Sequence, residues 1–183
     1  MEKHIQTPLT KQLAATLVAG DRVYISGDIY TARDAAHKRM QKAISEGESL
    51  PFDVKNQIIY YVGPAPAKPG DVIGSCGPTT SGRVDAYTPA LLDLGLVGMI
   101  GKGERSEQVI ESMMKNGSVY FAAIGGAGAL IAKCVKSVEP VAYDDLGTEA
   151  IVRLSVENFP LTVVIDSKGN NMYESERKKY KNS

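Results

Sequence analysis

The chain has 183 residues, of which 43% are hydrophobic, so it can bury one substantial core and we expect a single domain over residues 1–183. Lysine and arginine together number 21, as do aspartate and glutamate, and this balance argues against a nucleic acid partner. No apolar run approaches the roughly 18 residues of a membrane span. The start, "MEKHIQTPLTKQL", lacks the apolar stretch of a signal peptide, so we expect a soluble, cytoplasmic protein with no membrane contact.

The two cysteines, Cys76 and Cys134, limit the metal and disulfide chemistry of the chain. They cannot form a disulfide framework, and they cannot supply the four thiolates of an ordinary iron–sulfur or structural zinc site. We therefore expect the ligands of any metal to come largely from elsewhere. Both cysteines are expected to be small buried or half-buried apolar residues.

Strands and helices alternate along the first half of the chain, a pattern typical of α/β proteins. In chain order, the sequence predicts a strand ending at a glycine, a helix, a second strand and a proline-punctuated loop, at 21–27, 31–47, 57–63 and 64–70. Another helix should begin within 74–87 and end near Gly95, with Pro89 as an internal kink or a break into two pieces.

The second half continues with a strand, an amphipathic helix, a strand and a short helix, at 96–101, 106–117, 118–126 and 127–135. Ser106 is the expected N-cap of the amphipathic helix. Three more strands and a turn are expected at 137–143, 150–156, 160–165 and 166–171. The polar end, 174–183, should be frayed.

The stretch "GSCGPTTSGRVDAY" (74–87) has the composition of an anion pocket. Glycine lets the backbone approach a ligand closely, and Thr79, Thr80 and Ser81 offer hydroxyls that can cap a helix or bond a ligand. Arg83 can form two parallel hydrogen bonds with one carboxylate. If a helix begins here, its free N–H groups and dipole would also favour an anion.

Two nucleotide-binding motifs are close to this sequence but incomplete. Gly77 and Gly82 have the spacing of a phosphate-binding P-loop, yet Arg83 stands where the lysine belongs and Val84 where a magnesium-binding hydroxyl is needed. In "GGAGAL" (125–130), the third glycine of a dinucleotide loop would fall on Ile131. Close packing of a strand against a helix explains these glycines more simply.

Charged residues also follow two other predicted strands, where ligands of α/β folds usually bind. Arg33 and Asp34 begin a helix, with His37 one turn after Arg33, and Lys102 lies between two glycines directly after a strand. Each residue has a structural alternative. Arg33 can pair with a carboxylate, Asp34 suits the helix dipole, His37 can serve as a structural hydrogen-bonding residue, and Lys102 can be an ordinary turn lysine.

Four segments together resemble a known family: "SGDIYTARDAAHKRM", "VGPAPAKPGDVIGSCGPTTSGRVDAYTP", "LGLVGMIGKG" and "VYFAAIGGAGALIAKCV". They are similar to the β region of the class I, iron-sulfur-dependent fumarate hydratases and the related tartrate dehydratases. The likeness covers roughly residues 5–175 and leaves 176–183 as a frayed tail. It implies an α/β fold, namely a swivelling β/β/α domain with a mixed central sheet and flanking helices. The chain resembles the arrangement in which this region is a separate β subunit.

The resemblance also implies an activity, a cofactor and a partner. Such enzymes reversibly hydrate fumarate to (S)-malate with a [4Fe-4S] cluster held by the α subunit, and we expect a higher oligomer, such as a dimer of heterodimers. The implied catalytic base is Thr79, although the sequence leaves open whether Thr79 or Thr80 faces the substrate. The implied ligands of the substrate carboxylates are Arg33, Arg83 and Lys102, with Asp34, His37 and Thr80 as candidate supporting residues.

Three functions remain compatible with the sequence. The β subunit of a class I fumarate hydratase is favoured because "TARDAAHKR" and "GPTTSGR" are closer to that branch. The β subunit of an L(+)-tartrate dehydratase, a lyase that yields oxaloacetate, is the second. A stand-alone dicarboxylate-binding module, which would need no partner, is the third.

Overall fold

The computed structural model describes residues 1–123 and 127–181. Its strands are β1 (Glu2–Gln6), β2 (Arg22–Thr31), β3 (Ile58–Tyr60), β4 (Gly98–Gly101), β5 (Val119–Ala122), β6 (Val135–Ala142) and β7 (Ile151–Ile165). Its α-helices are α1 (Lys11–Ala14), α2 (Asp34–Ser45), α3 (Thr88–Asp93), α4 (Glu107–Asn116), α5 (Gly128–Cys134) and α6 (Met172–Lys181). Two 3-10 helices, η1 (Ser81–Val84) and η2 (Asp144–Glu149), complete this mixed α/β fold.

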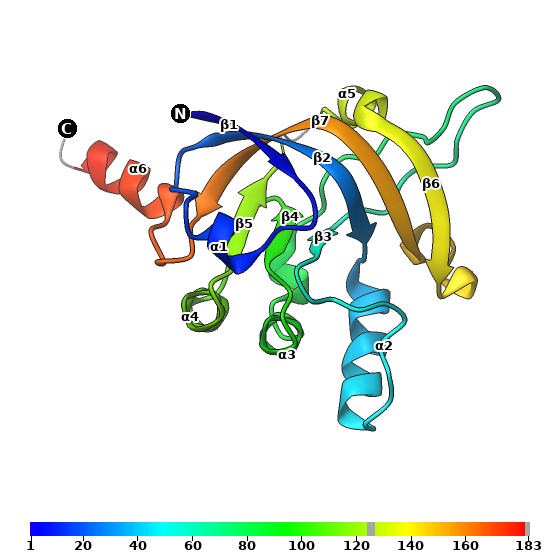
Figure 1. Ribbon diagram of the computed structural model, residues 1–183, viewed down its shortest axis with the longest axis horizontal. Helices are drawn as coiled ribbons and strands as arrows, with labels where there is room; N and C mark the ends of the chain where they lie inside the picture. Colours follow the sequence, from blue (N-terminus) through cyan, green and yellow to red (C-terminus); the bar gives the residue numbers. More distant parts are fainter. Residues whose placement is uncertain (124–126, 182–183) are drawn as a thin grey trace.

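The strands form one mixed sheet that closes on itself (Figure 1). Its order is β1-β2-β3-β4-β5-β7-β6, and β1 to β5 run parallel to one another. Strand β7 is antiparallel to β5, β6 and β2. Because β7 pairs with both β5 and β2, these strands and β3 and β4 form a closed ring. Strands β1 and β6 lie outside this ring and, among the described residues, are paired only with β2 and β7, respectively.

Alternate residues of the ring strands enter two separate hydrophobic clusters, as the two-residue period of a strand requires. One cluster contains Tyr60 and Phe159, whose rings meet edge to face at 5.3 Å although β3 and β7 are not hydrogen-bonded neighbours. This contact across the ring places the first cluster on its inner face. The second cluster contains Met99 and Tyr120 and is covered by α2, α3 and α4, which lie together on one side of the sheet (Figure 1).

Several predicted elements are confirmed. The strands expected at 57–63, 96–101 and 137–143 correspond to β3, β4 and β6, and the helix expected at 31–47 corresponds to α2, which begins at Asp34. Helix α4 has the expected cap, since Ser106 Oγ accepts a hydrogen bond from the Val109 N–H at 3.3 Å. Strand β5 matches the start of the segment expected at 118–126, whose last three residues lie outside the described part.

The prediction that the first long strand ends at Gly27 is wrong. Strand β2 continues to Thr31, and its pairing with β7 shifts register between Ile25 and Gly27. Gly27 has φ of 109°, a conformation that glycine adopts without strain, and a Cβ there would lie 2.2 Å from Thr7 Oγ1. The glycine therefore marks a bulge inside the strand and not its end.

Two other expectations also need correction. The strands expected at 150–156 and 160–165 are one strand, β7, because its pairing with β2 continues past Asn158. The polar end expected to be frayed forms α6, whose Tyr173 packs against the second cluster. The helix expected within 74–95 is divided into η1 and α3, which confirms the second alternative given for Pro89, and this proline lies in the first turn of α3. Strand β1, α1 and η2 were not predicted.

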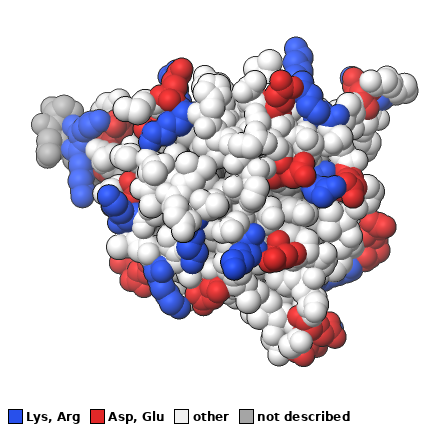
Figure 2. Space-filling view, in the orientation of Figure 1, with Lys and Arg blue, Asp and Glu red and all other residues white. Residues whose placement is uncertain are grey.

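The surface has no single-signed charge over the face seen in Figure 2, where acidic and basic side chains are interspersed. Among the helices of the described residues, none has the length and apolar character needed to cross a membrane.

Candidate functional site

The predicted site residues lie at the carboxyl ends of neighbouring parallel strands. The segment Thr79–Ser81 is held between the residues that follow β3 and β4. The Thr79 N–H donates to the Tyr61 carbonyl at 2.8 Å, and the Thr79 carbonyl accepts from the Lys102 N–H at 3.2 Å. The Ser81 N–H then donates to the Lys102 carbonyl at 2.9 Å. These bonds fix the backbone of Thr79, Thr80 and Lys102 next to one another, and η1 with Arg83 contacts α2 beside them.

The two threonines differ in their surroundings. Thr79 is half-buried, and its Oγ1 donates a hydrogen bond to the Tyr61 carbonyl at 2.9 Å. Thr80 is exposed and occupies the N-cap position of η1 without a side-chain capping bond. The oxygen of Thr79 therefore has a fixed position with its lone pairs directed away from the Tyr61 carbonyl, whereas the Thr80 hydroxyl is not fixed by a capping bond.

The basic groups of Arg83 and Lys102 are exposed. Within residues 1–123 and 127–181, neither side chain makes a hydrogen bond or an ion pair, so both charges are available to a ligand. The expected helix dipole contributes little here, because η1 is a single turn of four residues. Anion binding at this edge would therefore depend on the side-chain cations.

Arg33 lies at the N-cap of α2, after the end of β2. Its side chain is 24% exposed, and its Nε is 3.9 Å from Glu149 Oε1, too long for a hydrogen bond. Among the described residues Nε has no hydrogen-bond partner although it is buried. Gly63 makes room for the guanidinium, since a Cβ there would lie 2.7 Å from Arg33 Nη1. Arg33 is thus only weakly paired with a carboxylate.

His37 is buried and holds the start of α2. Its Nδ1 is 2.8 Å from the Arg33 carbonyl and must donate the proton, because a carbonyl can only accept. Burial lowers the pKa of His37 to about 4, so the ring is neutral at pH 7, and its Nε2 has no partner among the described residues. A neutral ring cannot contribute charge to the site, and the contact assigns His37 to fixing the Arg33 peptide. Asp34 is half-exposed in the first turn of α2.

Two residues that support this edge were not predicted. Tyr61 accepts through its carbonyl both hydrogen bonds that Thr79 donates, and the side chain of Arg105 lies fully buried between Tyr61 and Tyr120. An arginine directly before a helix cap has the sequence signature of a surface residue, so no pattern distinguished Arg105.

The glycine-rich loops are packed tightly against each other. A Cβ on Gly128 would lie 2.3 Å from Ser75 Oγ and 2.9 Å from the nitrogen of Gly77. The Cys76 N–H donates to the Gly128 carbonyl at 3.3 Å. Close backbone packing therefore explains Gly128, whereas Gly125 and Gly126 of the same predicted loop lie outside the described residues.

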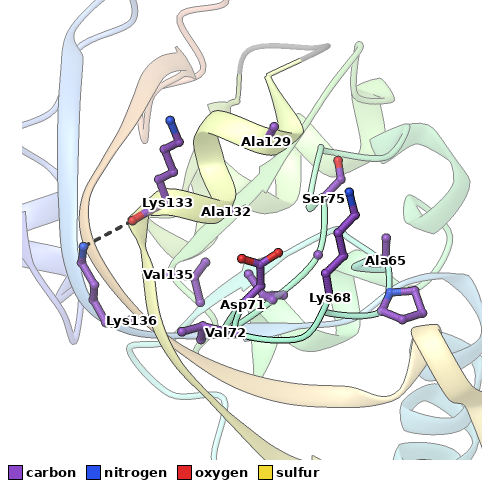
Figure 3. A pocket seen from close by; sticks show the side chains of 14 residues that line it. Ala65, Lys68, Asp71, Val72, Ser75, Ala129, Ala132, Lys133, Val135 and Lys136 are labelled. Atoms are coloured by element: carbon purple, nitrogen blue, oxygen red, sulfur yellow. Dashed lines mark hydrogen bonds between the residues drawn. The ribbon is translucent and has the colours of Figure 1, made fainter.

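A cavity of about 740 Å³ lies beside these loops, between the segment 65–75, α5 and the start of β6 (Figure 3). Lys68 and Asp71 come from the segment, and Lys133 and Lys136 come from the opposite wall, where the Lys136 ammonium donates to the Lys133 carbonyl at 3.3 Å. None of the predicted site residues lines this cavity.

The described residues do not fit an iron–sulfur cluster. They contain no group of three or more histidine, cysteine, aspartate or glutamate side chains that could hold a metal ion. Burial raises the pKa of Cys76 to about 11, which opposes the thiolate that a metal requires, and burial also raises the pKa of Cys134. Any cluster must therefore be held by another polypeptide or by residues outside the described part.

Known proteins are similar to this sequence over most of its length. The family model for the Fumarase C-terminus matches residues 2–176. "Fumarate hydratase class I, aerobic" of Escherichia coli (strain K12) is 41% identical over 155 residues, which are 84% of this chain and 28% of that protein. "Fumarate hydratase 2" of Leishmania major is 39% identical over 173 residues, 92% of this chain and 30% of that protein.

A relative of similar length comes from Methanocaldococcus jannaschii and is named as an L(+)-tartrate dehydratase subunit beta. It is 42% identical over 177 residues, which are 93% of this chain and 91% of that protein. The chain thus spans 28% of the Escherichia coli fumarate hydratase but 91% of the Methanocaldococcus protein. Since the family model covers nearly all of the sequence, the chain belongs to the Fumarase C-terminus family.

Proposed function

We propose that this chain is the β subunit of a class I fumarate hydratase, a hydro-lyase that interconverts fumarate and (S)-malate. The observation that supports the proposal most is the arrangement around Thr79. Its backbone is hydrogen-bonded to that of Lys102, Arg83 follows in the adjoining turn, and the two cationic groups are exposed without a protein partner in the described residues. A small dicarboxylate would supply the negative charges that could pair with these two cations.

In the dehydration direction, Thr79 is the proposed base. Its oxygen takes the proton from C3 of malate, the C–H electron pair becomes the second bond of the alkene, and the C2–O bond breaks as hydroxide leaves. Threonine is a weak base, and Thr79 must first release to solvent the proton that it donates to the Tyr61 carbonyl. Nearby cations favour that loss, because an opposite charge lowers the pKa of an acidic group.

Arg33, Arg83 and Lys102 are the proposed ligands of the two substrate carboxylates. Removal of a proton next to a carboxylate places negative charge on that group, and cations that bind it stabilise the transition state. The supporting residues act on the backbone. His37 holds the Arg33 carbonyl, Asp34 favours the start of α2, and Thr80 links Thr79 to η1.

The partner in this proposal is an α subunit, which would hold the [4Fe-4S] cluster and with it supply a Lewis acid for the departing hydroxide. The described residues contain no group of side chains that could hold a metal ion. Closure of this chain over the partner, as a swivelling domain, would bring the exposed cations onto the substrate and expel water. We expect a cytoplasmic complex with the α subunit, such as a dimer of heterodimers.

The β subunit of an L(+)-tartrate dehydratase is the second candidate. It is favoured by one observation, the match over 91% of a protein named as that subunit. Tartrate also has two carboxylates, so the same cations would hold it. The two candidates differ in the additional hydroxyl of the substrate, and an assay must separate them.

The test is anaerobic co-expression with the α subunit and assays with fumarate, malate and L(+)-tartrate. We expect fumarate turnover by the complex and none by the isolated chain. Thr79→Ala should lower kcat by about 10²–10⁴-fold, the usual contribution of a positioned base. Arg83→Ala should mainly raise KM, while Arg22→Ala, at the opposite end of β2, serves as the matched control. Near-normal turnover of Thr79→Ala would refute the assigned base, and dicarboxylate binding by the isolated chain that the partner does not change would favour a binding module.

A further inference from the structure

Arg105 is a buried cation next to the site that the proposed mechanism does not use. Its side chain is 0% exposed, and its Nε donates to Asp85 Oδ1 at 2.7 Å. Its Nη2 donates to Thr88 Oγ1 at 2.9 Å. The second oxygen of Asp85 accepts the Ser106 N–H at 2.7 Å. The ion pair is therefore tied to α3 and to the start of α4, and its position is fixed from both sides.

The guanidinium lies between two tyrosine rings. Its Cζ is 5.3 Å from the centroid of Tyr61 and 5.0 Å from that of Tyr120, distances at which a cation attracts an aromatic face. Its Nη1 also donates to the Tyr61 hydroxyl at 3.2 Å. Arginine remains charged at any physiological pH and has a planar shape, so this arrangement holds both rings continuously.

Each tyrosine continues into the candidate site by a different route. The Tyr61 carbonyl accepts the N–H and the hydroxyl of Thr79 at 2.8 and 2.9 Å. The Tyr120 hydroxyl donates to the Gly103 carbonyl at 2.9 Å. Having donated its only proton there, it must accept from the Ser81 hydroxyl at 2.8 Å. One tyrosine thus holds Thr79, and the other holds the residues next to Thr80 and Lys102.

We propose that Arg105 is a positioning residue, which fixes Thr79 through Tyr61 and fixes the backbone beside Lys102 through Tyr120. This inference rests on the proposed function, because Thr79 and Lys102 are the groups it places. A buried ion pair loses its hydration and adds little to stability, so its geometry is the better explanation for its presence. Precise placement matters, since a base displaced by about 1 Å can lose on the order of 10²-fold in rate.

Backbone amide exchange in the full chain tests the positioning independently of activity. In Arg105→Lys, which keeps the charge but loses the planar fork, we expect NMR to show at least tenfold faster exchange at the amides of Thr79, Ser81 and Lys102. The amide of Val163, which donates to the distant Asp21 carbonyl, should be unchanged. Exchange within twofold of wild type at the three site amides would overturn the proposal.

Two single-atom variants separate the two routes. Tyr61→Phe removes the hydroxyl that Arg105 donates to and should speed exchange mainly at Thr79. Tyr120→Phe removes the bonds to Ser81 and Gly103 and should speed exchange mainly at Ser81. These variants keep the ring packing, so they carry the test if Arg105→Lys does not fold. Equal effects of both variants at both amides would contradict separate routes.

Kinetics of the complex with the α subunit provide the second readout. Arg105→Lys should lower kcat at least tenfold and raise KM by a smaller factor, because the base Thr79 is displaced whereas only Lys102 of the three proposed carboxylate ligands is held through Arg105. Arg39→Lys is the matched control, since Arg39 also pairs with a carboxylate, Asp145, and lies over a tyrosine ring, Tyr143, at 5.2 Å. A wild-type kcat in Arg105→Lys would overturn the proposal. Faster site exchange in this variant, with no hydratase activity in the wild-type complex, would instead uphold the positioning and reject the proposed function.

Discussion

Lowering the pH should destabilise the fold through His37. The ring is buried and its folded pKa is about 4, against an ordinary value of 6.5. Below pH 6.5 the unfolded chain binds a proton at His37 that the folded chain does not. The free energy of unfolding is therefore unaffected by this group above pH 6.5 and declines as the pH falls toward 4. Between pH 7.5 and 4.5 this proton linkage amounts to about 2.5 kcal/mol of unfolding free energy.

Urea unfolding of the wild type and of His37→Phe across this pH range measures the effect. Phenylalanine keeps a ring against Tyr61, 5.4 Å from the histidine ring in the wild type, but cannot titrate. As the pH falls, the unfolding free energy of the wild type should therefore decrease by about 2.5 kcal/mol relative to that of His37→Phe. His4→Phe, at an exposed position of β1, is the control and should show the same pH dependence of the unfolding free energy as the wild type. A difference between wild type and His37→Phe that stays constant within about 0.5 kcal/mol would refute the reasoning.

Three further results are expected. Gly101→Ala should lower the unfolding free energy by about 1–3 kcal/mol, because its Cβ would lie 2.0 Å from Ser81 Oγ, and adding Ser81→Ala should recover part of this loss in urea titrations. Cys76 is buried and its pKa is raised to about 11, so at pH 8 it should react with iodoacetamide at least tenfold more slowly than the half-buried Cys134. Peptide mass spectrometry measures both rates, and equal rates would contradict the burial of Cys76. Asp166→Ala should cost about 3 kcal/mol in thermal or urea unfolding, since this buried carboxylate accepts several backbone N–H groups of the turn after β7, and a loss under about 1 kcal/mol would contradict that role.

The fold was predictable where local chemistry decides it. Ser106 and Gly117 bound α4 as their cap preferences require, and the apolar alternation before Gly27 identified the first half of β2. Strand β1 has no such signal, because Ile5 is its only fully buried residue and its order comes from pairing with β2. The bulge at Gly27 depends on a distant contact with Thr7, which no local pattern contains.

The candidate site likewise contains residues that the sequence could indicate and residues that it could not. Thr79, Arg83 and Lys102 could be named because glycines flank reactive residue types in loops after predicted strands. Arg105 could not, since its burial results from the convergence of several elements on one guanidinium. The helix dipole expected at the site is weak, because α3 starts only at Thr88 and the turn beside Arg83, η1, has four residues. Residue chemistry thus predicted which groups could bind a ligand, whereas the contacts that hold these groups depend on tertiary packing.

Thr79 is held in place by hydrogen bonds, whereas the cations Arg83 and Lys102 are exposed, and this difference has an electrostatic consequence for the proposed function. Two unit charges 4 Å apart interact by about 1 kcal/mol in bulk water but about 4 kcal/mol at an effective dielectric constant of 20. Arg83 and Lys102 are exposed in this chain, so solvent weakens their attraction for a dicarboxylate. A partner that covers them would strengthen that attraction severalfold without moving Thr79, whose position Tyr61 already fixes. Dependence of turnover on the α subunit would then follow from the exclusion of water as well as from the cluster that the partner is proposed to hold.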